Sequence, residues 1–278
     1  MDNSLDMLNI LSMKVILSIF LFLSCQLAHG AVYISAQTED GLFHRGEVIE
    51  SYEDRWFYEE ASEQTKRYLL LFKEEAGKAK FKMLSYEQIK RVRLLGFFPS
   101  KYKSFLRKNK IILKKEVVRN QAILTGNHGH HKFERMFGNF AWDLGILDEH
   151  GKQHRGDGSL LTDYYIFNEE IKAPIGGEVV GKISDMPDNP ASPSLTGDLS
   201  QKINNYLTIK IQYPFYLSLV HFKKDSIRVN IGDKVKADQV LGLVGNSGVS
   251  YIPHLHYTLY IYEEGLKRFI SVPALLEN

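Results

Sequence analysis

VHFKKDSIRVNIGDKVKADQVLGLVGNSGVSYIPHLHYTLY, residues 220–260, indicates the fold of this chain more clearly than its other segments. Short apolar runs, such as residues 240–244 and 255–260, are separated there by glycine, asparagine and aspartate. Runs of this length, rich in branched and aromatic residues and bounded by turn residues, are typical of β-strands. The stretch therefore predicts a β-rich domain.

The end of this stretch, PHLHYTLY at residues 253–260, places His254 and His256 two positions apart in a predicted strand. Side chains at positions i and i+2 of a strand point to the same face, so we expect the two imidazoles to lie side by side. They could share a metal ion, or one could bind metal while the other transfers protons. Both could also simply line a hydrated strand face, and the rest of the chain must distinguish these cases.

Residues 120–278 continue the β pattern outward from this stretch. APIGGEVVGKI, NNYLTIKI and FYLSLVHF are further apolar runs, and turn residues recur about every 8 to 12 positions. This spacing favours a sandwich or barrel over a parallel α/β fold. Residues 184–202, rich in proline, serine and aspartate, predict a surface loop that could border a groove.

Several residues in this region are candidates for a metal or catalytic site. His128, His130 and His131 precede Asp143, which lies in the apolar run FAWDLG. A carboxylate is costly to bury unless something pairs with it, and zinc, a salt bridge or a hydrogen-bonded turn would serve. His221 also lies in an apolar run and, taken alone, is typical of an ordinary core histidine.

The order of these pieces resembles the lysostaphin/LytM-type zinc metallopeptidases. The resemblance is carried by a histidine in an apolar strand, Ile231-Gly232-Asp233, the glycine-rich segment 242–248 and Pro-His-Leu-His. APIGGEVVG at 173–181 and PDNP at 187–190 match further family segments, and the pieces together cover about residues 120–265.

The resemblance implies roles for individual residues. Asp143 and His256 would bind zinc, with His131 as the third ligand and His130 as its alternative, while His254 would handle protons with His221 beside it. Asp238 departs from the family's glycine, although aspartate tolerates left-handed backbone conformations better than most residues. Leu219 and Phe222 also depart from the commoner residues around the strand histidine.

The resemblance further implies a mainly β protein whose metallopeptidase domain, residues 116–278, is an antiparallel β-sandwich or barrel-like fold of the duplicated hybrid motif type. Its expected activity is zinc-dependent hydrolysis of the peptide cross-links of peptidoglycan, with either a D-amino-acid cross-link or a glycine bridge as the bond cut. A non-catalytic regulator of cell-wall amidases and a wall-binding module are the rival interpretations.

Residues 31–115 predict a small β-rich N-terminal domain, SH3-like in its strand pattern. EEAGK at 74–78 resembles a turn between strands, and SYEQIKRVRLLGFF is either a short helix or a further strand. The basic run at 101–115 is interpreted as the connector to the second domain. It could meet an anionic surface, such as the cell wall or lipid headgroups, or be a solvated face.

The N-terminus predicts export to the periplasm, the cell envelope or the exterior. An apolar run from Val15 to Ala28 follows Lys14 and is shorter than a membrane span, and Ala28-His29-Gly30 suits signal cleavage. Residues 1–30 are therefore a predicted signal peptide, with an uncleaved anchor as the alternative. The single cysteine, Cys25, lies within it, so the mature chain would have neither disulfides nor thiolate ligands. A net charge of +2 gives no indication of nucleic-acid binding.

Overall fold

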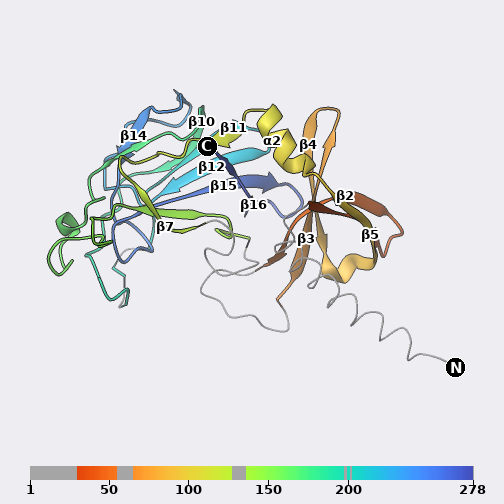
Figure 1. Cartoon of the computed structure of the whole chain (residues 1–278), viewed down its shortest axis with the longest axis horizontal. Helices are drawn as coiled ribbons and strands as arrows, with labels where there is room; N and C mark the ends of the chain where they lie inside the picture. Colours follow the sequence, from red (N-terminus) through yellow and green to blue (C-terminus); the bar gives the residue numbers. More distant parts are fainter. Residues whose placement is uncertain (1–29, 55–64, 127–135, 197–198, 201, 278) are drawn as a thin grey trace. The chain divides into compact units, whose positions relative to one another are not determined.

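The computed structural model describes residues 30–54, 65–126, 136–196, 199–200 and 202–277. The chain divides into two compact units, and each is described by itself (Figure 1). Unit 1 comprises residues 1–109 and 134–136, and unit 2 comprises residues 110–133 and 137–278. Residues 1–29, which contain nearly all of the predicted signal peptide, lie outside the described residues. The sequence-based domain limits, 31–115 and 116–278, stay predictions.

Unit 1, the N-terminal unit, is an antiparallel sheet with the strand order β4-β3-β2-β1-β5. The turn between β3 and β4 has positive φ at Ala76 (50°) and Gly77 (73°), as the favoured two-residue hairpin turn requires. This confirms the predicted turn in EEAGK. β4 and β5 form the two edges, so the described strands make an open sheet and not a closed barrel. The elements are β1 (Ala31–Thr38), β2 (Phe43–Glu53), β3 (Arg67–Glu75), β4 (Lys78–Ser85), the 3-10 helix η1 (Tyr86–Gln88) and β5 (Ile89–Phe98).

The basic run after β5 begins as a helix, α2 (Lys101–Lys108), which corrects its interpretation as a connector. Ser100 caps the helix, because its Oγ accepts a hydrogen bond from the backbone N–H of Lys103 at 2.9 Å. Tyr102 and Phe105 are buried and lie edge-on to Phe72 of β3, with ring centroids 5.3 and 5.7 Å away. The lysines face solvent while the apolar side chains hold the helix on the sheet.

Unit 2 contains an eight-stranded sheet whose main path is β13-β10-β11-β12-β15-β8-β7, with β16 paired to β15. All its pairs are antiparallel, which agrees with the predicted fold class. Two small sheets accompany it, β14 with β9 and the parallel pair β17 with β6. The strands of the main sheet are β7 (Ala122–Gly126), β8 (Trp142–Gly145), β10 (Gly177–Ile183), β11 (Tyr206–Gln212), β12 (Phe215–Val220), β13 (Lys234–Val235), β15 (Leu255–Glu263) and β16 (Arg268–Ser271). The remaining elements are β6 (Ile112–Leu113), the 3-10 helix η2 (Leu161–Asp163), β9 (Glu170–Lys172), β14 (Val240–Leu243) and β17 (Leu275–Leu276).

The core of unit 2 lies against one face of this sheet and fixes which residues face the other side. Leu217 and Leu219 of β12 and Leu255 and Tyr257 of β15 belong to one buried apolar cluster. Because strand side chains alternate, His256 of β15 points away from that cluster. The apolar alternation therefore sets the direction of a polar side chain next to it.

The predicted strand at residues 253–260 begins later than expected, because β15 starts at Leu255 and leaves Pro253 and His254 before it. Proline lacks the N–H that a central strand must donate, which accounts for the shift. Within the described ranges, no helix combines the length and apolar character needed to cross a membrane.

Candidate active site

Three neighbouring strands of unit 2 bring the predicted site residues together. β15 pairs with β8 on one side, with His256 directly opposite Asp143. On its other side β15 pairs with β12, with His256 opposite Val220, the residue before His221. A row of three adjacent strands thus places His221, His256 and Asp143 next to one another, although they come from distant parts of the sequence.

His256 is held between a carboxylate and a hydroxyl. Its Nδ1 lies 3.0 Å from Oδ1 of Asp143, and its Nε2 lies 3.3 Å from Oγ1 of Thr258. Thr258 is fully buried and His256 is 4% exposed, so water has little access to this imidazole. When Nε2–H donates to Thr258, the lone pair of Nδ1 points toward the side where the Asp143 carboxylate lies.

His221 occupies a strained position at the end of β12. Its φ is 69°, in the left-handed region that non-glycine residues rarely adopt. Its N–H donates to the carbonyl of Asn205 at 3.0 Å, and its Nδ1 donates to the carbonyl of Ser247 at 2.7 Å. Burial, followed by repulsion from His254 and His256, holds the pKa of His221 well below its usual value. The imidazole is therefore neutral and presents Nε2 as an acceptor.

His254 completes the group from the residue before β15. Its Nδ1 donates to the carbonyl of Ile252 at 2.9 Å, which turns Nε2 toward Asp143, 3.5 Å from Oδ1. The ring lies 4.5 Å from that of His221, centroid to centroid. His254 and Asp143 keep some solvent access, with 14% and 18% of their side chains exposed. Both His254 and His256 thus lie next to Oδ1 of Asp143, as expected if the two imidazoles face the same side.

A buried hydrogen-bond network supports His254 from behind. Ser250 Oγ lies 3.2 Å from Nδ1 of His254 and also donates to Oδ1 of Asn246 at 2.6 Å. The side chain of Asn246 donates to the carbonyl of Asn189, whose own side chain donates to the carbonyl of Gly248. The predicted surface loop containing PDNP is therefore tied to the glycine-rich loop beside the site.

Two glycines in this loop are required by close approach. A Cβ on Gly245 would lie 2.4 Å from Oδ1 of Asp188 and from the backbone N of Lys223. Gly248 has φ +78°, and a Cβ there would lie 1.8 Å from Asn204 Oδ1. Burial raises the pKa of the Asp188 carboxyl, although the backbone N–H groups of Asn246 and Lys224 donate to it. The glycines allow the two loops to pack with no gap between them.

The donor chemistry of this group suits a divalent metal. Asp143 and His256 direct a carboxylate oxygen and an imidazole nitrogen to a shared region, and the Thr258 hydroxyl fixes the ring from the other side, as is usual for ligating histidines. Among the described residues, no group of three or more His, Cys, Asp or Glu side chains could hold a metal ion. The predicted third ligand, His131, and its alternative, His130, lie outside the described residues.

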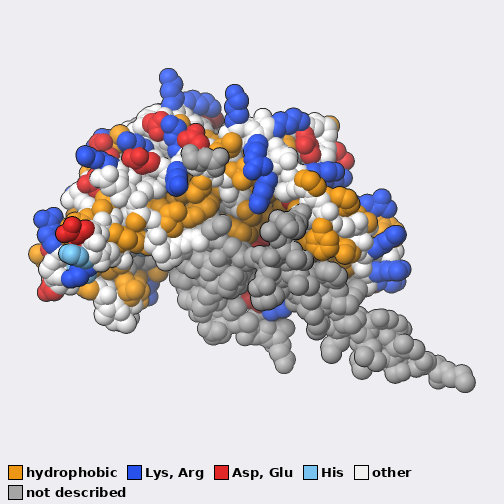
Figure 2. Space-filling model, in the orientation of Figure 1, with side chains coloured by type: hydrophobic (Ala, Val, Ile, Leu, Met, Phe, Trp, Pro, Cys, Tyr) orange, Lys and Arg blue, Asp and Glu red, His pale blue; other side chains and the backbone are white. Residues whose placement is uncertain are grey.

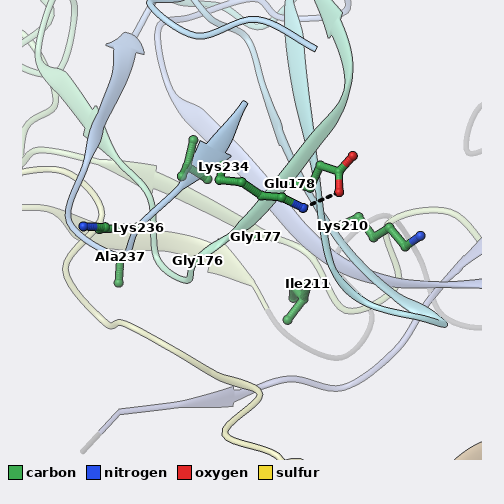
Figure 3. Close-up of a pocket in the computed structure, with 9 residues that line it drawn as sticks. Gly176, Gly177, Glu178, Lys210, Ile211, Lys234, Lys236 and Ala237 are labelled. Atoms are coloured by element: carbon green, nitrogen blue, oxygen red, sulfur yellow. Dashed lines mark hydrogen bonds and ion pairs between the residues drawn. The ribbon is translucent and has the colours of Figure 1, made fainter. Parts of the chain in front are cut away.

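A second concave region has a different composition. A hollow of about 470 Å³ lies where β10, β11 and β13 meet, and its charged side chains are Glu178, Lys210, Lys234 and Lys236 (Figure 3). Lys234 forms an ion pair with Glu178 at 2.5 Å, and this hydrogen bond is the main reason the pKa of Glu178 is lowered. The lining contains none of the predicted site residues, so the hollow is not the candidate active site.

Sequence reasoning missed the buried polar residues that position the histidines, namely Asn189, Asn205, Asn246, Ser247 and Ser250. Their pairing joins segments far apart in sequence, and the sole local signal was the mixture of Asn and Ser with Gly in 245–250. Asp238, noted as a departure from glycine, has φ 66°, so the left-handed conformation is kept. Leu219 and Phe222 are fully buried core residues.

Part of the chain is similar in sequence to known proteins. Residues 163–267 match Peptidase family M23, a segment that contains His221, His254 and His256. A curated relative from Buchnera aphidicola subsp. Baizongia pistaciae (strain Bp), described as an "Uncharacterized metalloprotease", is 40% identical over 70 residues. That match covers 25% of this chain and 18% of the relative, so the chain spans less than a fifth of the relative's length.

Solved structures of low sequence identity are also similar. The catalytic domain of a prophage-encoded M23 protein, EnpA, from Enterococcus faecalis is 21% identical, with a TM-score of 0.34, covering 58% of this chain and 95% of that one. A zinc-containing peptidase from Vibrio cholerae is 14% identical, with a TM-score of 0.35, covering 86% and 76%. The similarity to Peptidase family M23 is therefore stated for residues 163–267, the segment that the family model matches.

Proposed function

We propose that the protein is an exported zinc metalloendopeptidase that hydrolyses the peptide cross-links of peptidoglycan. The observation that carries the proposal is the pairing of His256 with Asp143 across β15 and β8, with His221 and His254 beside them. A carboxylate and three imidazoles on or next to neighbouring strands, each ring held by a hydrogen bond, form a preorganised site for hydrolysis.

Asp143 and His256 would hold the zinc ion, with His131 as the predicted third ligand. Bound zinc would lower the pKa of a water molecule and polarise the carbonyl of the scissile bond. The buried Thr258 hydroxyl keeps the His256 ring in one orientation, so the ligand nitrogen needs no rearrangement on binding.

His254 would move the proton. Its Nδ1–H is committed to the Ile252 carbonyl, so Nε2 has a free lone pair on the side of Asp143 and can accept a proton from the attacking water. The neutral His221, fixed in the same way by Ser247, would orient that water or a substrate N–H through its own Nε2. Partial exposure of His254 and Asp143 leaves the reacting side open to a peptide.

The substrate class and the location rest on the family resemblance and on the N-terminal sequence. The apolar run before Ala28 and the small residues at Ala28 and Gly30 suit export. Peptide cross-links of the cell wall lie in the compartment that such a protein would reach. A chain without mature cysteines would also keep its fold unchanged in an oxidising compartment.

The proposal is tested with purified peptidoglycan and four forms of the full chain. Wild type should release soluble muropeptides, whereas Asp143→Ala and His256→Ala should release none above background. His150→Ala is the matched control, because the side chain of His150 is 74% exposed and lies outside the site. This control should retain wild-type release.

Equal release by wild type and His256→Ala would contradict the catalytic proposal. Absence of release by wild type, together with stimulation of a purified cell-wall amidase, would favour the non-catalytic regulator. Export is tested separately by determining the N-terminus of the protein recovered from expressing cells. We expect it to begin close after Gly30, and an intact N-terminus in the cytoplasm would contradict export.

A further inference from the structure

One face of the sheet in unit 1 carries exposed cationic and aromatic side chains that the peptidase chemistry does not use. The register places Ser35 of β1 opposite Arg45 on β2 and opposite Arg93 on β5. Residues paired directly across antiparallel strands share a face, so the two arginines flank Ser35 on the same side. We call this surface the arginine face, and its members are Phe43, Arg45, Arg91, Arg93 and Phe98.

The exposure of these side chains is unusual for a sheet face. All five are exposed, and Phe43 is 62% exposed. Leu42, next to Phe43 at the turn between β1 and β2, is 57% exposed. Figure 2 shows Lys and Arg side chains next to hydrophobic ones over the part of unit 1 that contains β2 and β5. Large apolar side chains left in water beside arginines mark an interaction surface.

The segment that carries Arg91 and Arg93 is strongly basic. Residues 89–109 contain seven Lys and Arg residues and no Asp or Glu. Glu47 shares this face at the next register position but is 3% exposed. Its carboxylate accepts hydrogen bonds from the Tyr33 hydroxyl, the Ser100 hydroxyl and the Tyr102 N–H. The negative charge is thus taken up inside the unit, while the arginines remain at the surface.

We propose that the arginine face binds an anionic lipid surface. Arginines would contact the phosphate headgroups, and the exposed phenylalanines with Leu42 would enter the boundary between headgroups and acyl chains. Aliphatic Leu42 cannot stack on nucleic-acid bases but can enter lipid. The proposal does not rest on the peptidase function, because every residue of the face lies in unit 1.

Charge complementarity supports lipid as the occupant. The exposed Arg45, Arg91 and Arg93 lie on the same face as the exposed Phe43 and Phe98. Cationic side chains suit phosphate headgroups, and large apolar side chains beside them suit the boundary with the acyl chains.

A second copy of the chain is a poorer occupant. Two arginine faces would repel each other, and β5, although an edge strand, has a register irregularity between the positions paired with Tyr33 and Ile34. Gly96 at this irregularity has φ +137°. Bulged edges of this kind disfavour the addition of another strand.

The test measures sedimentation of the full chain, in the form recovered from expressing cells, with lipid vesicles. Vesicles of phosphatidylcholine alone are compared with vesicles containing about a third phosphatidylglycerol. The arginine variant combines Arg45→Glu, Arg91→Glu and Arg93→Glu. The control combines Lys152→Glu, Lys224→Glu and Lys236→Glu, three exposed cations of unit 2.

Wild type and control should bind the anionic vesicles equally within about twofold, and the arginine variant should bind more than about tenfold more weakly. Thermal unfolding midpoints establish that both variants are folded. Leu42→Ser with Phe43→Ser is a second test that keeps every charge, and it should also weaken binding. Equal binding of wild type and the arginine variant, or equal losses in both charge variants, would overturn the proposal. A dimer or an oligonucleotide complex that the arginine variant abolishes, with no vesicle binding by wild type, would also overturn it.

Discussion

Polar side chains are buried in the candidate active site and exposed on the arginine face. In the site, polar groups such as His221, Thr258 and Asn246 are buried, and each has a defined hydrogen-bond partner. On the arginine face, Arg91 and Arg93 extend into solvent next to an exposed phenylalanine. Buried hydrogen-bond partners fix the positions of the site side chains, which hydrolysis requires. Exposed charges attract an anionic surface, and their exact positions matter less. Mutations should therefore have large and specific effects in the first region and small effects on folding in the second.

The largest effect is expected at His256. His256→Ala removes an imidazole that lies 3.0 Å from Asp143, and activity on peptidoglycan should fall by at least about a hundredfold. Muropeptide release measured by chromatography checks this, with His150→Ala as the control for removal of an exposed imidazole. Activity within twofold of wild type would show that the buried pair is structural.

The next largest effect is expected at Ser250, whose hydroxyl lies 3.2 Å from Nδ1 of His254. Ser250→Ala removes the hydroxyl that links His254 to Asn246, and hydrolysis should slow by about tenfold to a hundredfold while zinc content stays unchanged. Ser194→Ala, which removes a hydroxyl in the exposed loop, is the matched control. If Ser250→Ala lost zinc as readily as His256→Ala, the hydroxyl would support the whole site and not His254 in particular.

A smaller effect, on stability, is expected where the glycine-rich loop at 245–248 packs against the loop that contains residues 187–190. Gly245→Ala places a methyl group 2.4 Å from Asp188 and from the Lys223 backbone, so the free energy of unfolding should fall by about 1–3 kcal/mol. At Gly265 the nearest atoms are the carboxylate oxygens of the flexible Glu263 side chain, so Gly265→Ala should cost less. Chemical denaturation of both variants measures the difference. Equal losses would mean that the loop contact does not constrain position 245.

The smallest effect is expected on the arginine face. Arg93→Ser should change the free energy of unfolding by less than about 0.5 kcal/mol, because the exposed guanidinium leaves the core of unit 1 unaltered. Denaturation by urea, compared with wild type, is sufficient to detect a larger change. A loss above about 2 kcal/mol would indicate that Arg93 stabilises the sheet. The arginine face would then affect folding, contrary to the difference expected between it and the candidate active site.

The sequence predicted the strand-rich architecture, because the alternation of apolar residues and the spacing of turn residues are local signals. The pairing of Asp143 with His256 as zinc ligands was implied by the family resemblance; the structure places the two side chains 3.0 Å apart, and their role as ligands stays a prediction. Asp238, which replaces the family's glycine, has φ 66°, a left-handed conformation that aspartate tolerates better than most residues. Whether His131 or His130 approaches this pair stays a prediction. The roles assigned to His221 and His254 also stay predictions, although the structure places both rings beside Asp143.

Other features could not be predicted because they depend on contacts distant in sequence. The network from Asn189 through Asn246 to Ser250 joins two loops that no local pattern connects. The helix α2 was missed for a different reason. Its buried residues Tyr102 and Phe105 have helical spacing and Ser100 caps it, but the many basic residues of the run at 101–115 favoured its interpretation as a connector.

Zinc content of the purified full chain tests the central claim most directly. We expect about one zinc ion per chain in wild type and in His150→Ala, measured by elemental analysis after exhaustive dialysis against metal-free buffer. Asp143→Ala and His256→Ala should each contain close to none while remaining folded. Zinc absent from a wild-type protein that still cleaves peptidoglycan, or bound equally by all four proteins, would contradict it.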